Sequence, residues 1–258
     1  MYHEASFQVG ARDVDPFNLC RPSSMMDFLQ EAATGAAVEL HVSREEMLRS
    51  YNVFWMLARI WYCLDTPVFW DDKLTVQTWH RGSGHGASMY RDFDIFRNGK
   101  TIGEGVSLWV LADVETRKLR RVSDLPEFDG TSGGDRCKSR MLPKLRMPVP
   151  LETAGERRLW YSDCDVNGHV NNVHYADYAC DAIRLEEVGR GQFVSQVQIG
   201  YLKECRAGET IRLSAGRQGD TFYVQGDGGE GKPRFDAALT LSDAALTLSP
   251  LDNPHLGA

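Results

Sequence analysis

The chain has 258 residues, of which 42% are apolar and 25% charged, a balance typical of a folded protein with one large domain or two smaller ones. Its formal net charge of −7 argues against nucleic-acid binding as its main role. The most apolar run, Val53–Leu64, is too short to span a membrane and contains Arg59.

The cysteines show no paired C-x-x-C spacing, so zinc sites and redox motifs are poorly supported. They lie at Cys20, Cys63, Cys137, Cys164, Cys180 and Cys205. Free thiols in a reducing compartment fit this pattern. The N-terminal stretch MYHEASFQVG lacks the apolar segment of a signal peptide. We therefore expect a cytoplasmic protein without membrane insertion.

The first half of the chain predicts one helix followed by several strands. After a polar segment, apolar residues from Met25 to Ala36 recur three or four apart, which is typical of an amphipathic helix. Asn98-Gly99 is the signal of a tight hairpin between two later strands. Runs rich in β-branched and aromatic residues predict strands at Val53–Leu64, Lys73–Trp79, Ser88–Arg97 and Gly103–Leu111.

Glycine and proline are frequent in residues 129–150, so this segment is predicted to be a linker. It would join an N-terminal domain, residues 1–128, to a C-terminal domain, residues 151–242. Residues 243–258 are expected to form a tail. The sequence AALTLS occurs at Ala237–Ser242 and again at Ala244–Ser249, and only the first copy is needed for a strand.

Short polar side chains crowd the region before the helix of the second half. Asp165, Asn167 and His169 alternate with Val166 and Gly168, so in an extended segment they would point to one side. A single Asn or Asp would be enough to cap a helix. The alternating set therefore favours a chemical site beside a helix N-terminus over a purely structural cap.

The remainder of the second half repeats the plan of the first. Helical spacing from Val173 to Ile183 is followed by predicted strands at Phe193–Leu202, Glu209–Gly216, Thr221–Gln225 and Phe235–Leu241. The halves align without a gap at an offset of 150 residues, which pairs Asp13 with Asp163, Asp15 with Asp165, Phe17 with Asn167, and Leu19 with His169. We interpret this as a duplicated α+β unit, with reactive groups in the second copy and apolar ones in the first.

The motif D-x-N-x-H-V-N-N-x-x-Y at Asp165–Tyr175 resembles the active-site motif of acyl-ACP thioesterases. Thr66–Val76, Ser107–Phe128 and Tyr201–Glu209 resemble further segments of this family, with Thr66 in place of the usual Tyr. The resemblance implies two tandem hotdog domains, each an antiparallel β-sheet wrapped on a central helix. It also implies hydrolysis of long- or medium-chain fatty acyl-ACP to free fatty acid and holo-ACP, without a metal or organic cofactor.

By this resemblance Asp165, Asn167, His169 and Glu204 match catalytic positions, and Cys205 matches a cysteine once cast as a nucleophile. In one mechanism Glu204 and His169 activate a water, Asp165 orients the imidazole, and Asn167 holds the water or the substrate carbonyl. In the other, Cys205 attacks as a thiolate. Adjacent strand residues point to opposite faces, so only one of the two can face His169, and we expect it to be Glu204. A surface role for Glu204 is the structural alternative.

The helix N-terminus is expected to offer free N–H groups to the substrate carbonyl, with Asn171 and Asn172 as caps and substrate-loop anchors. The resemblance places the acyl chain in an apolar pocket of the first half. The candidate lining residues, which would equally suit a protein core, are Met25, Met26, Leu29, Trp55 and Trp61.

The implied partner is ACP, an acidic protein, so docking on this acidic chain needs a local basic face. Arg117–Arg146 holds nine Lys or Arg against four acidic residues. We take Arg136, Lys138, Arg140 and Lys144 as candidate contacts, although a solvated charged linker would look the same. The tandem architecture is compatible with a monomer or a homodimer.

Three other functions remain open. An acyl-CoA thioesterase of the same fold would carry the same catalytic motif. A non-catalytic acyl-binding hotdog protein would not need the set of polar groups around His169. A hydroxyacyl-ACP dehydratase shares the fold, but its motif differs from HVNN.

Overall fold

The computed structural model describes residues 1–82, 86–128, 130–229 and 231–244. Two compact units are formed by these residues. The first contains Met1–Gln8, Met26–Tyr62 and Lys73–Pro143, and the second contains Val9–Met25, Cys63–Asp72 and the chain from Lys144 onward. Each unit combines an antiparallel sheet with a helix, which confirms the predicted α+β class.

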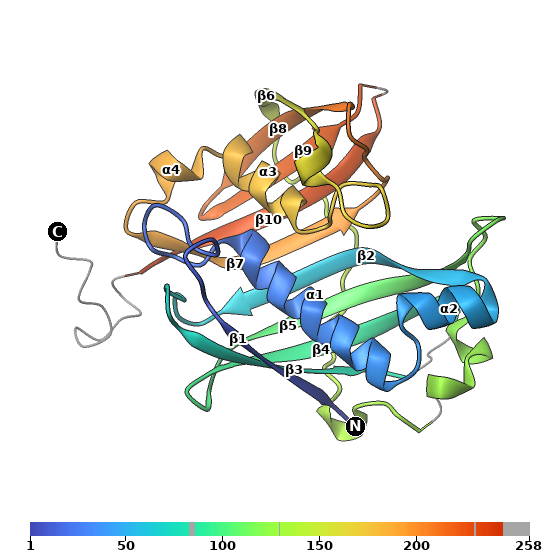
Figure 1. Cartoon of the computed structure of the whole chain (residues 1–258). Helices are drawn as coiled ribbons and strands as arrows, with labels where there is room; N and C mark the ends of the chain where they lie inside the picture. The colour runs from blue at the N-terminus through green and yellow to red at the C-terminus, as the bar shows by residue number, and fades with distance from the viewer. Residues whose placement is uncertain (83–85, 129, 230, 245–258) are drawn as a thin grey trace. The chain divides into compact units, whose positions relative to one another are not determined.

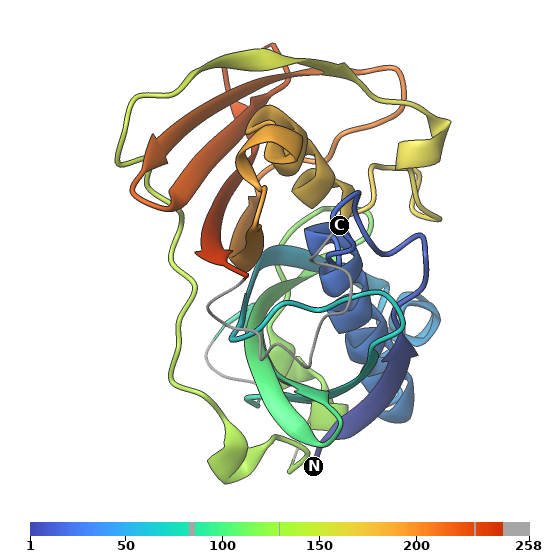
Figure 2. The same ribbon diagram turned by 90° about the vertical axis from the view of Figure 1, so that its left-hand side faces the viewer.

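The first unit is a curved sheet with one long helix across it. Strands β1, β3, β4 and β5 pair antiparallel in that order, and β2 lies beside β5. Figure 1 shows α1 crossing one face of this sheet, and in Figure 2 the sheet curves around the helix. The elements are β1 (His3–Gln8), α1 (Pro22–Glu39), α2 (Arg44–Tyr51), β2 (Val53–Leu64), β3 (Lys73–His80), β4 (Ser88–Arg97) and β5 (Lys100–Asp113).

Local sequence signals explain the ends of several of these elements. The predicted hairpin is confirmed: Asn98 and Gly99 take φ of 52° and 75°, and Arg97 pairs with Lys100. Helix α2 begins with a capping box, in which Ser43 and Glu46 each accept from the other's backbone N–H. Helix α2 was not predicted from the sequence, because most of its eight residues are charged or polar.

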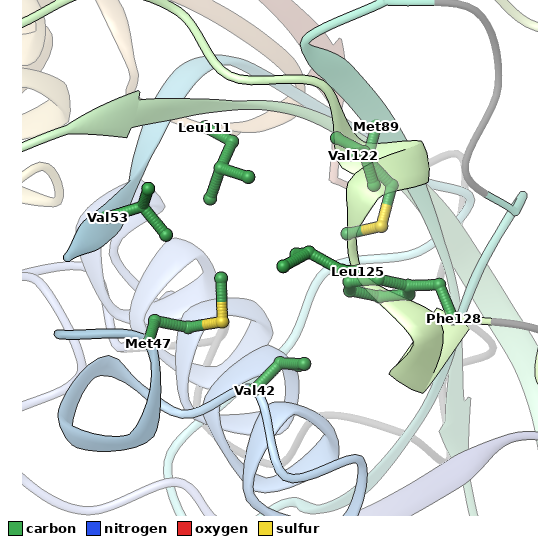
Figure 3. Close-up of a cluster of buried hydrophobic side chains, with 8 residues drawn as sticks. All are labelled: Val42, Met47, Val53, Met89, Leu111, Val122, Leu125 and Phe128. Carbon is green, nitrogen blue, oxygen red and sulfur yellow. The ribbon is translucent and has the colours of Figure 1, made fainter. Parts of the chain in front are cut away.

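A cluster of buried apolar side chains fills one end of the first unit (Figure 3). Two 3₁₀ turns, η1 (Val122–Asp124) and η2 (Pro126–Phe128), close it. Phe128 receives the ring of Trp55 edge-on, with centroids 5.8 Å apart. The members are Val42, Met47, Val53, Met89, Leu111, Val122, Leu125 and Phe128.

The second unit has the strand order β7-β10-β9-β8-β6, with every neighbouring pair antiparallel. Helix α3 packs on this sheet through Tyr175, whose ring lies 5.1 Å from that of Phe235 and 5.5 Å from that of Tyr201. The elements are β6 (Glu152–Arg158), α3 (His174–Ala182), α4 (Leu185–Val188), β7 (Gln192–Tyr201), β8 (Thr210–Gln218), β9 (Thr221–Asp227) and β10 (Pro233–Asp243).

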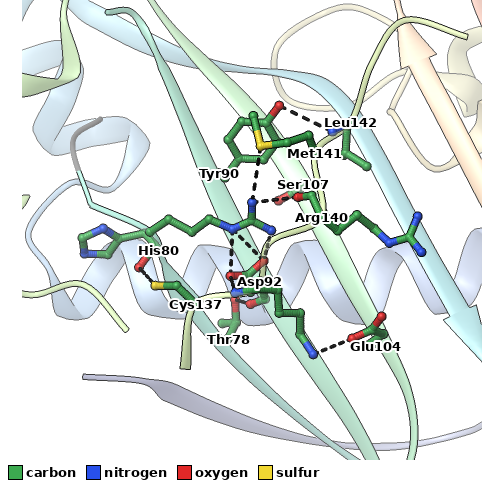
Figure 4. A network of polar contacts seen from close by, with 12 residues as sticks. Thr78, His80, Tyr90, Asp92, Glu104, Ser107, Cys137, Arg140, Met141 and Leu142 are labelled. Carbon is green, nitrogen blue, oxygen red and sulfur yellow. Dashed lines mark hydrogen bonds and ion pairs between the residues drawn. The ribbon is translucent and has the colours of Figure 1, made fainter. Parts of the chain in front are cut away.

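Part of the predicted linker is bound to the first unit through a polar network (Figure 4). Asp92 on β4 is 0% exposed and accepts from the Arg81 guanidinium at 2.6 to 3.0 Å and from the Lys138 backbone N–H at 2.9 Å. The Lys138 ammonium bonds to Asp94 at 2.7 Å and to Glu104 at 2.6 Å. These bonds fix the segment around Lys138 on the sheet.

Replacing Asp92 by alanine is expected to lower the free energy of unfolding by about 3–5 kcal/mol. The change leaves the Arg81 guanidinium without its carboxylate in a site where Arg81 is itself only 12% exposed. Chemical denaturation measures the effect. Asp94→Ala is the matched control, because Asp94 belongs to a more exposed ion pair and should cost about 1 kcal/mol or less. Equal losses for the two variants would contradict this account.

Only the first of the two AALTLS copies lies fully within the described residues. The first copy forms most of β10. The second copy lies outside the described residues except for Ala244. Of the rest of the predicted tail, only Asp243 is described, and it is the last residue of β10. In the part of the chain that is described, no helix is long and apolar enough to cross a membrane.

Candidate active site

The second half carries its polar motif on a tight turn between η4 (Tyr161–Asp163) and α3. Asp165 N–H donates to His169 O at 3.0 Å, and Gly168 N–H donates to Asp165 O at 3.0 Å. The Asp165 carboxylate accepts from Asn167 N–H at 2.8 Å. The extended segment expected from the sequence is therefore wrong. The Asp165 side chain closes the chain into a turn, and Gly168 supplies the required positive φ of 75°.

The predicted repeat is confirmed bond by bond in this loop. Asp165 and its neighbours have counterparts in the first half at the offset of 150 residues, with Asn18 at φ 64° in place of Gly168. The matching bonds are Asp15 N to Leu19 O (2.8 Å), Asn18 N to Asp15 O (3.0 Å), Phe17 N to Asp15 Oδ1 (2.8 Å) and Arg21 N to Asp13 O (2.7 Å). One loop scaffold thus occurs twice, and it carries an amide and an imidazole in the second copy only.

The turn gathers three of the predicted site residues. Asp165 Oδ1 lies 3.9 Å from His169 Nδ1, and Asp165 Oδ2 accepts from Asn167 Nδ2 at 3.4 Å. His169 Nδ1 lies closer, at 3.2 Å, to the carbonyl oxygen of Val170. The neighbouring carbonyl, and not the Asp165 carboxylate, is therefore the hydrogen-bond partner of this imidazole nitrogen.

Glu204 and Cys205 differ sharply in their surroundings. Both follow β7 in an irregular turn, and Cys205 O accepts from Val170 N–H at 2.8 Å, which ties this turn to the residue after His169. Glu204 is exposed, whereas Cys205 is 0% exposed. Burial raises the pKa of the Cys205 thiol despite its hydrogen bond with Tyr175. A neutral, enclosed thiol is a poor nucleophile.

The start of α3 is occupied by local hydrogen bonds. Asn171 N–H donates to Asp163 O at 2.8 Å, Val173 N–H to Asn171 Oδ1 at 3.2 Å, and His174 N–H to Asn171 O at 3.1 Å. Asn172 O accepts from the Tyr201 hydroxyl at 3.0 Å. Free N–H groups were predicted at a helix beginning near Asn171, but α3 begins at His174, and these three N–H groups are hydrogen-bonded to Asp163 and Asn171.

The sequence analysis gave no weight to His174, whose imidazole lies 3.2 Å from Asp177 Oδ2 and is stacked on Tyr178. The hydrogen bond to Asp177 raises the pKa of His174 above 6.5, and the charge of Asp163 adds to the effect against partial burial and Arg157. The folded protein therefore favours the protonated imidazole. This stabilisation is fully present below about pH 6.5 and is lost as the pH rises through the higher folded-state pKa.

We expect His174→Gln to remove a pH-dependent contribution to stability of about 1 kcal/mol or less. The wild-type protein should therefore lose more thermal stability than the variant between about pH 6 and about pH 8.5. Differential scanning calorimetry at the two pH values measures this. The same pH dependence in both proteins would show that the pair contributes nothing.

The candidate acyl-pocket residues are buried side chains. Met25, Met26 and Leu29 are at most 1% exposed, and Trp61 is 3% exposed. Trp55 packs against the apolar cluster of Figure 3. This burial is what a core requires, so a role in acyl binding stays a prediction.

The candidate basic contacts are mostly engaged within the first unit. Lys138 is neutralised by two carboxylates, and Arg140 lies over the ring of Trp61 at 3.7 Å from its centroid. Arg136 stacks on Tyr2 and Trp79 and donates to Gln77. These four residues were predicted to form a basic face for the partner, with a solvated linker as the alternative, but tertiary contacts engage three of the four side chains.

Comparisons with known proteins support the family resemblance and the fold. The family model for the acyl-ACP thioesterase N-terminal domain matches residues 1–127, and that for the C-terminal domain matches residues 152–231. Oleoyl-acyl carrier protein thioesterase 1, chloroplastic, of Arabidopsis thaliana is 23% identical over 235 residues, which cover 81% of this chain and 62% of that protein. The chain spans about half the length of several of the curated relatives it matches.

Two solved structures share the fold. An acyl-ACP thioesterase from Bacteroides thetaiotaomicron superposes with a TM-score of 0.77 at 21% identity, covering 93% of this chain and 98% of that one. The 12:0-ACP thioesterase from Umbellularia californica gives 0.73 at 19% identity, covering 94% and 97%. These likenesses confirm the predicted tandem hotdog architecture.

Proposed function

Because the chain belongs to the acyl-ACP thioesterase family, we propose that it hydrolyses the thioester of fatty acyl-ACP to a free fatty acid and holo-ACP. The observation that carries the proposal is the match of both family domains together with the side chains gathered on the Asp165–His169 turn. The degenerate copy of this turn in the first half supports a single catalytic centre, in the second half.

His169 is the proposed proton carrier. Because its Nδ1 is placed to donate to Val170 O, the neutral imidazole has Nε2 as its basic nitrogen. Nε2 takes a proton from water as the water oxygen bonds to the thioester carbon. It then returns the proton to the sulfur as the C–S bond breaks, so the thiol of holo-ACP leaves neutral.

Asn167 is the proposed donor to the carbonyl oxygen. Its amide has two N–H bonds, and one is directed to Asp165 Oδ2. When substrate binds, an N–H of this amide can stabilise the negative charge that develops on the carbonyl oxygen, a contribution typically worth about 3–4 kcal/mol of barrier. Asp165 thereby acts mainly by shaping the turn and orienting the Asn167 amide, with a longer-range attraction to the imidazole.

Glu204 is the proposed second base that holds the attacking water. It is exposed, and its carbonyl is anchored by Arg234 Nη1 at 3.1 Å. Val170, the residue after His169, is hydrogen-bonded to Cys205, the residue after Glu204. This bond brings together the two segments that carry His169 and Glu204. The buried, neutral Cys205 thiol supports water, rather than sulfur, as the nucleophile.

We assign the acyl chain to apolar side chains of the first half, and the carrier to exposed basic residues. Met25, Met26, Leu29, Trp55 and Trp61 remain the lining candidates, with each buried methylene worth about 0.8 kcal/mol. Lys144 is exposed and is the docking candidate that best keeps its charge available. The engaged side chains of Arg136, Lys138 and Arg140 make them weaker candidates.

The test is thiol release from acyl-ACPs of C8 to C18 chain length, with the matching acyl-CoAs assayed alongside. Fast release from ACP and slow release from CoA is the expected result and would give the chain-length preference. Comparable rates on CoA would instead support an acyl-CoA thioesterase. Tight binding of acyl-ACP without release would identify a binding protein and overturn the proposed function.

A further inference from the structure

The two copies of the loop scaffold are anchored to their neighbouring helix in different ways. In the first copy, Phe7 stacks on Phe28 with ring centroids 4.9 Å apart and planes at 23°. At the offset of 150 residues these positions become Arg157 and Tyr178. There the guanidinium lies over the tyrosine ring, 4.4 Å from its centroid. An apolar stack in one copy is thus a cation–π contact in the other.

The arginine adds bonds that phenylalanine cannot make. Arg157 Nη2 pairs with Asp163 Oδ1 at 3.3 Å, and Arg157 Nη1 pairs with Asp181 Oδ2 at 3.1 Å. Asp163 precedes the polar turn, whereas Asp181 lies near the end of α3. The Arg157 side chain on β6 therefore links Asp163, just before the turn, to α3, the helix that follows the turn.

Asp163 accepts a hydrogen bond at each end of the turn. Its carboxylate accepts from Trp160 N–H at 2.7 Å where the chain enters, and its carbonyl accepts from Asn171 N–H at 2.8 Å where the chain leaves. The Asp163 side chain is 5% exposed and that of Arg157 is 37% exposed. Although burial opposes ionisation, the Trp160 N–H, the Tyr178 hydroxyl and the Arg157 charge together keep the pKa of Asp163 below its usual value.

We propose that Arg157 is a positioning residue for the proposed thioesterase site: it clamps Asp163 to α3 and so holds the turn that carries Asn167 and His169. This rests on the proposed function. The first copy folds into the same turn with Phe7 and Phe28, so a charged clamp is not required to form the turn. It is present in the copy whose side chains must keep a fixed geometry during a reaction, where small displacements are costly.

The chain itself supplies the test, because the first copy shows an apolar pair that fits the scaffold. The double variant Arg157→Phe/Tyr178→Phe transplants that pair. It is expected to stay folded, because the first copy forms the same turn with this apolar pair, but to lose kcat on acyl-ACP by about tenfold or more at unchanged KM. Arg157→Lys should retain most of the activity. Tyr178→Phe alone is the matched control: it removes the hydroxyl beside Asp163 but keeps the ring and both Arg157 ion pairs, so it should retain most of the kcat that the double variant loses.

Amide hydrogen exchange provides a second readout of the turn's rigidity that does not depend on catalytic turnover. In the double variant, residues 164–172 should exchange faster, while the aligned residues 14–22 of the same molecule should not change. Wild-type kcat together with unchanged exchange in the double variant would overturn the proposal. The proposal would also be overturned if Arg157→Lys lost as much kcat and as much thermal stability as the double variant. A wild-type protein inactive on every thioester would defeat the proposed function, while the exchange result would still decide whether Arg157 clamps the turn.

Discussion

His169→Ala is expected to lower kcat for acyl-ACP hydrolysis by about 10²–10⁴-fold without unfolding the protein. The imidazole is the group on the turn that can both accept a proton from water and deliver one to the leaving sulfur. Its side chain is 24% exposed, so its removal leaves little apolar surface unpacked. The hydrogen bonds that close the turn join backbone groups and the Asp165 side chain rather than the imidazole, whose Nδ1 contacts only the adjacent Val170 O among the contacts described. Leu19 occupies the same position in the first copy.

The measurement is steady-state thiol release, with the thermal midpoint recorded in parallel. His174→Gln is the matched control, because it also removes an imidazole from this region but leaves the proposed chemistry intact. Its kcat should stay within about threefold of wild type, since it touches no reacting atom. A His169→Ala protein that keeps more than about a tenth of the wild-type kcat would rule out His169 as the proton carrier.

Runs of β-branched and aromatic residues predicted the long strands well, and helical spacing predicted the helices. Val53–Leu64 and Ser88–Arg97 have the predicted bounds, and the helical spacing in both halves marks α1 and α3. Strand β6 was not assigned, because its sequence ETAGERR has no apolar alternation. Its hydrogen bonds to β8, a partner distant in the chain, make it a strand.

The composition of the site was predictable, but its geometry was not. Alternation suggested an extended segment, yet the Asp165 side chain bonds to the backbone two residues on, which folds the chain back. The internal repeat already indicated a structural role for Asp165, since its counterpart Asp15 is present in the first copy, where Leu19 stands in place of the histidine. A residue kept in the copy without chemistry indicates a structural task, which is the role the hydrogen bonds give to Asp165.

Charge counting was least reliable where tertiary contacts neutralise the charges. Lys138 and Arg140 looked like a basic surface, but their partners Asp94, Glu104 and Trp61 lie far away in sequence. Arg157 is the opposite case, a charged residue that the sequence did not single out but that makes several tertiary contacts. Nothing in the sequence ETAGERR marks it, and its importance appears only when its contacts are set beside those of Phe7 in the other copy.

The choice between water and sulfur as the nucleophile depends on two adjacent residues, and their substitution should give opposite results. Glu204→Gln is expected to reduce kcat by about 10²–10⁴-fold, because the amide keeps the size of the side chain but lacks the negative charge that holds and polarises the water while His169 takes its proton. The residue is exposed, so the thermal midpoint should change little. Cys205→Ala should retain most of the activity, since the thiol is enclosed and burial keeps it protonated.

The two variants should also differ in stability. Cys205 is fully buried and packs beneath Tyr175, so its truncation to alanine removes core contacts and should lower the thermal midpoint. The expected pattern is thus a stable, inactive Glu204 variant and a less stable, active Cys205 variant. The reverse pattern in kcat would establish a covalent thioester on Cys205, and that intermediate could then be trapped by acid quenching and detected as a mass increase equal to the acyl group. Such a result would require the 202–209 turn to open during turnover, because the enclosed thiol cannot otherwise reach a substrate carbonyl.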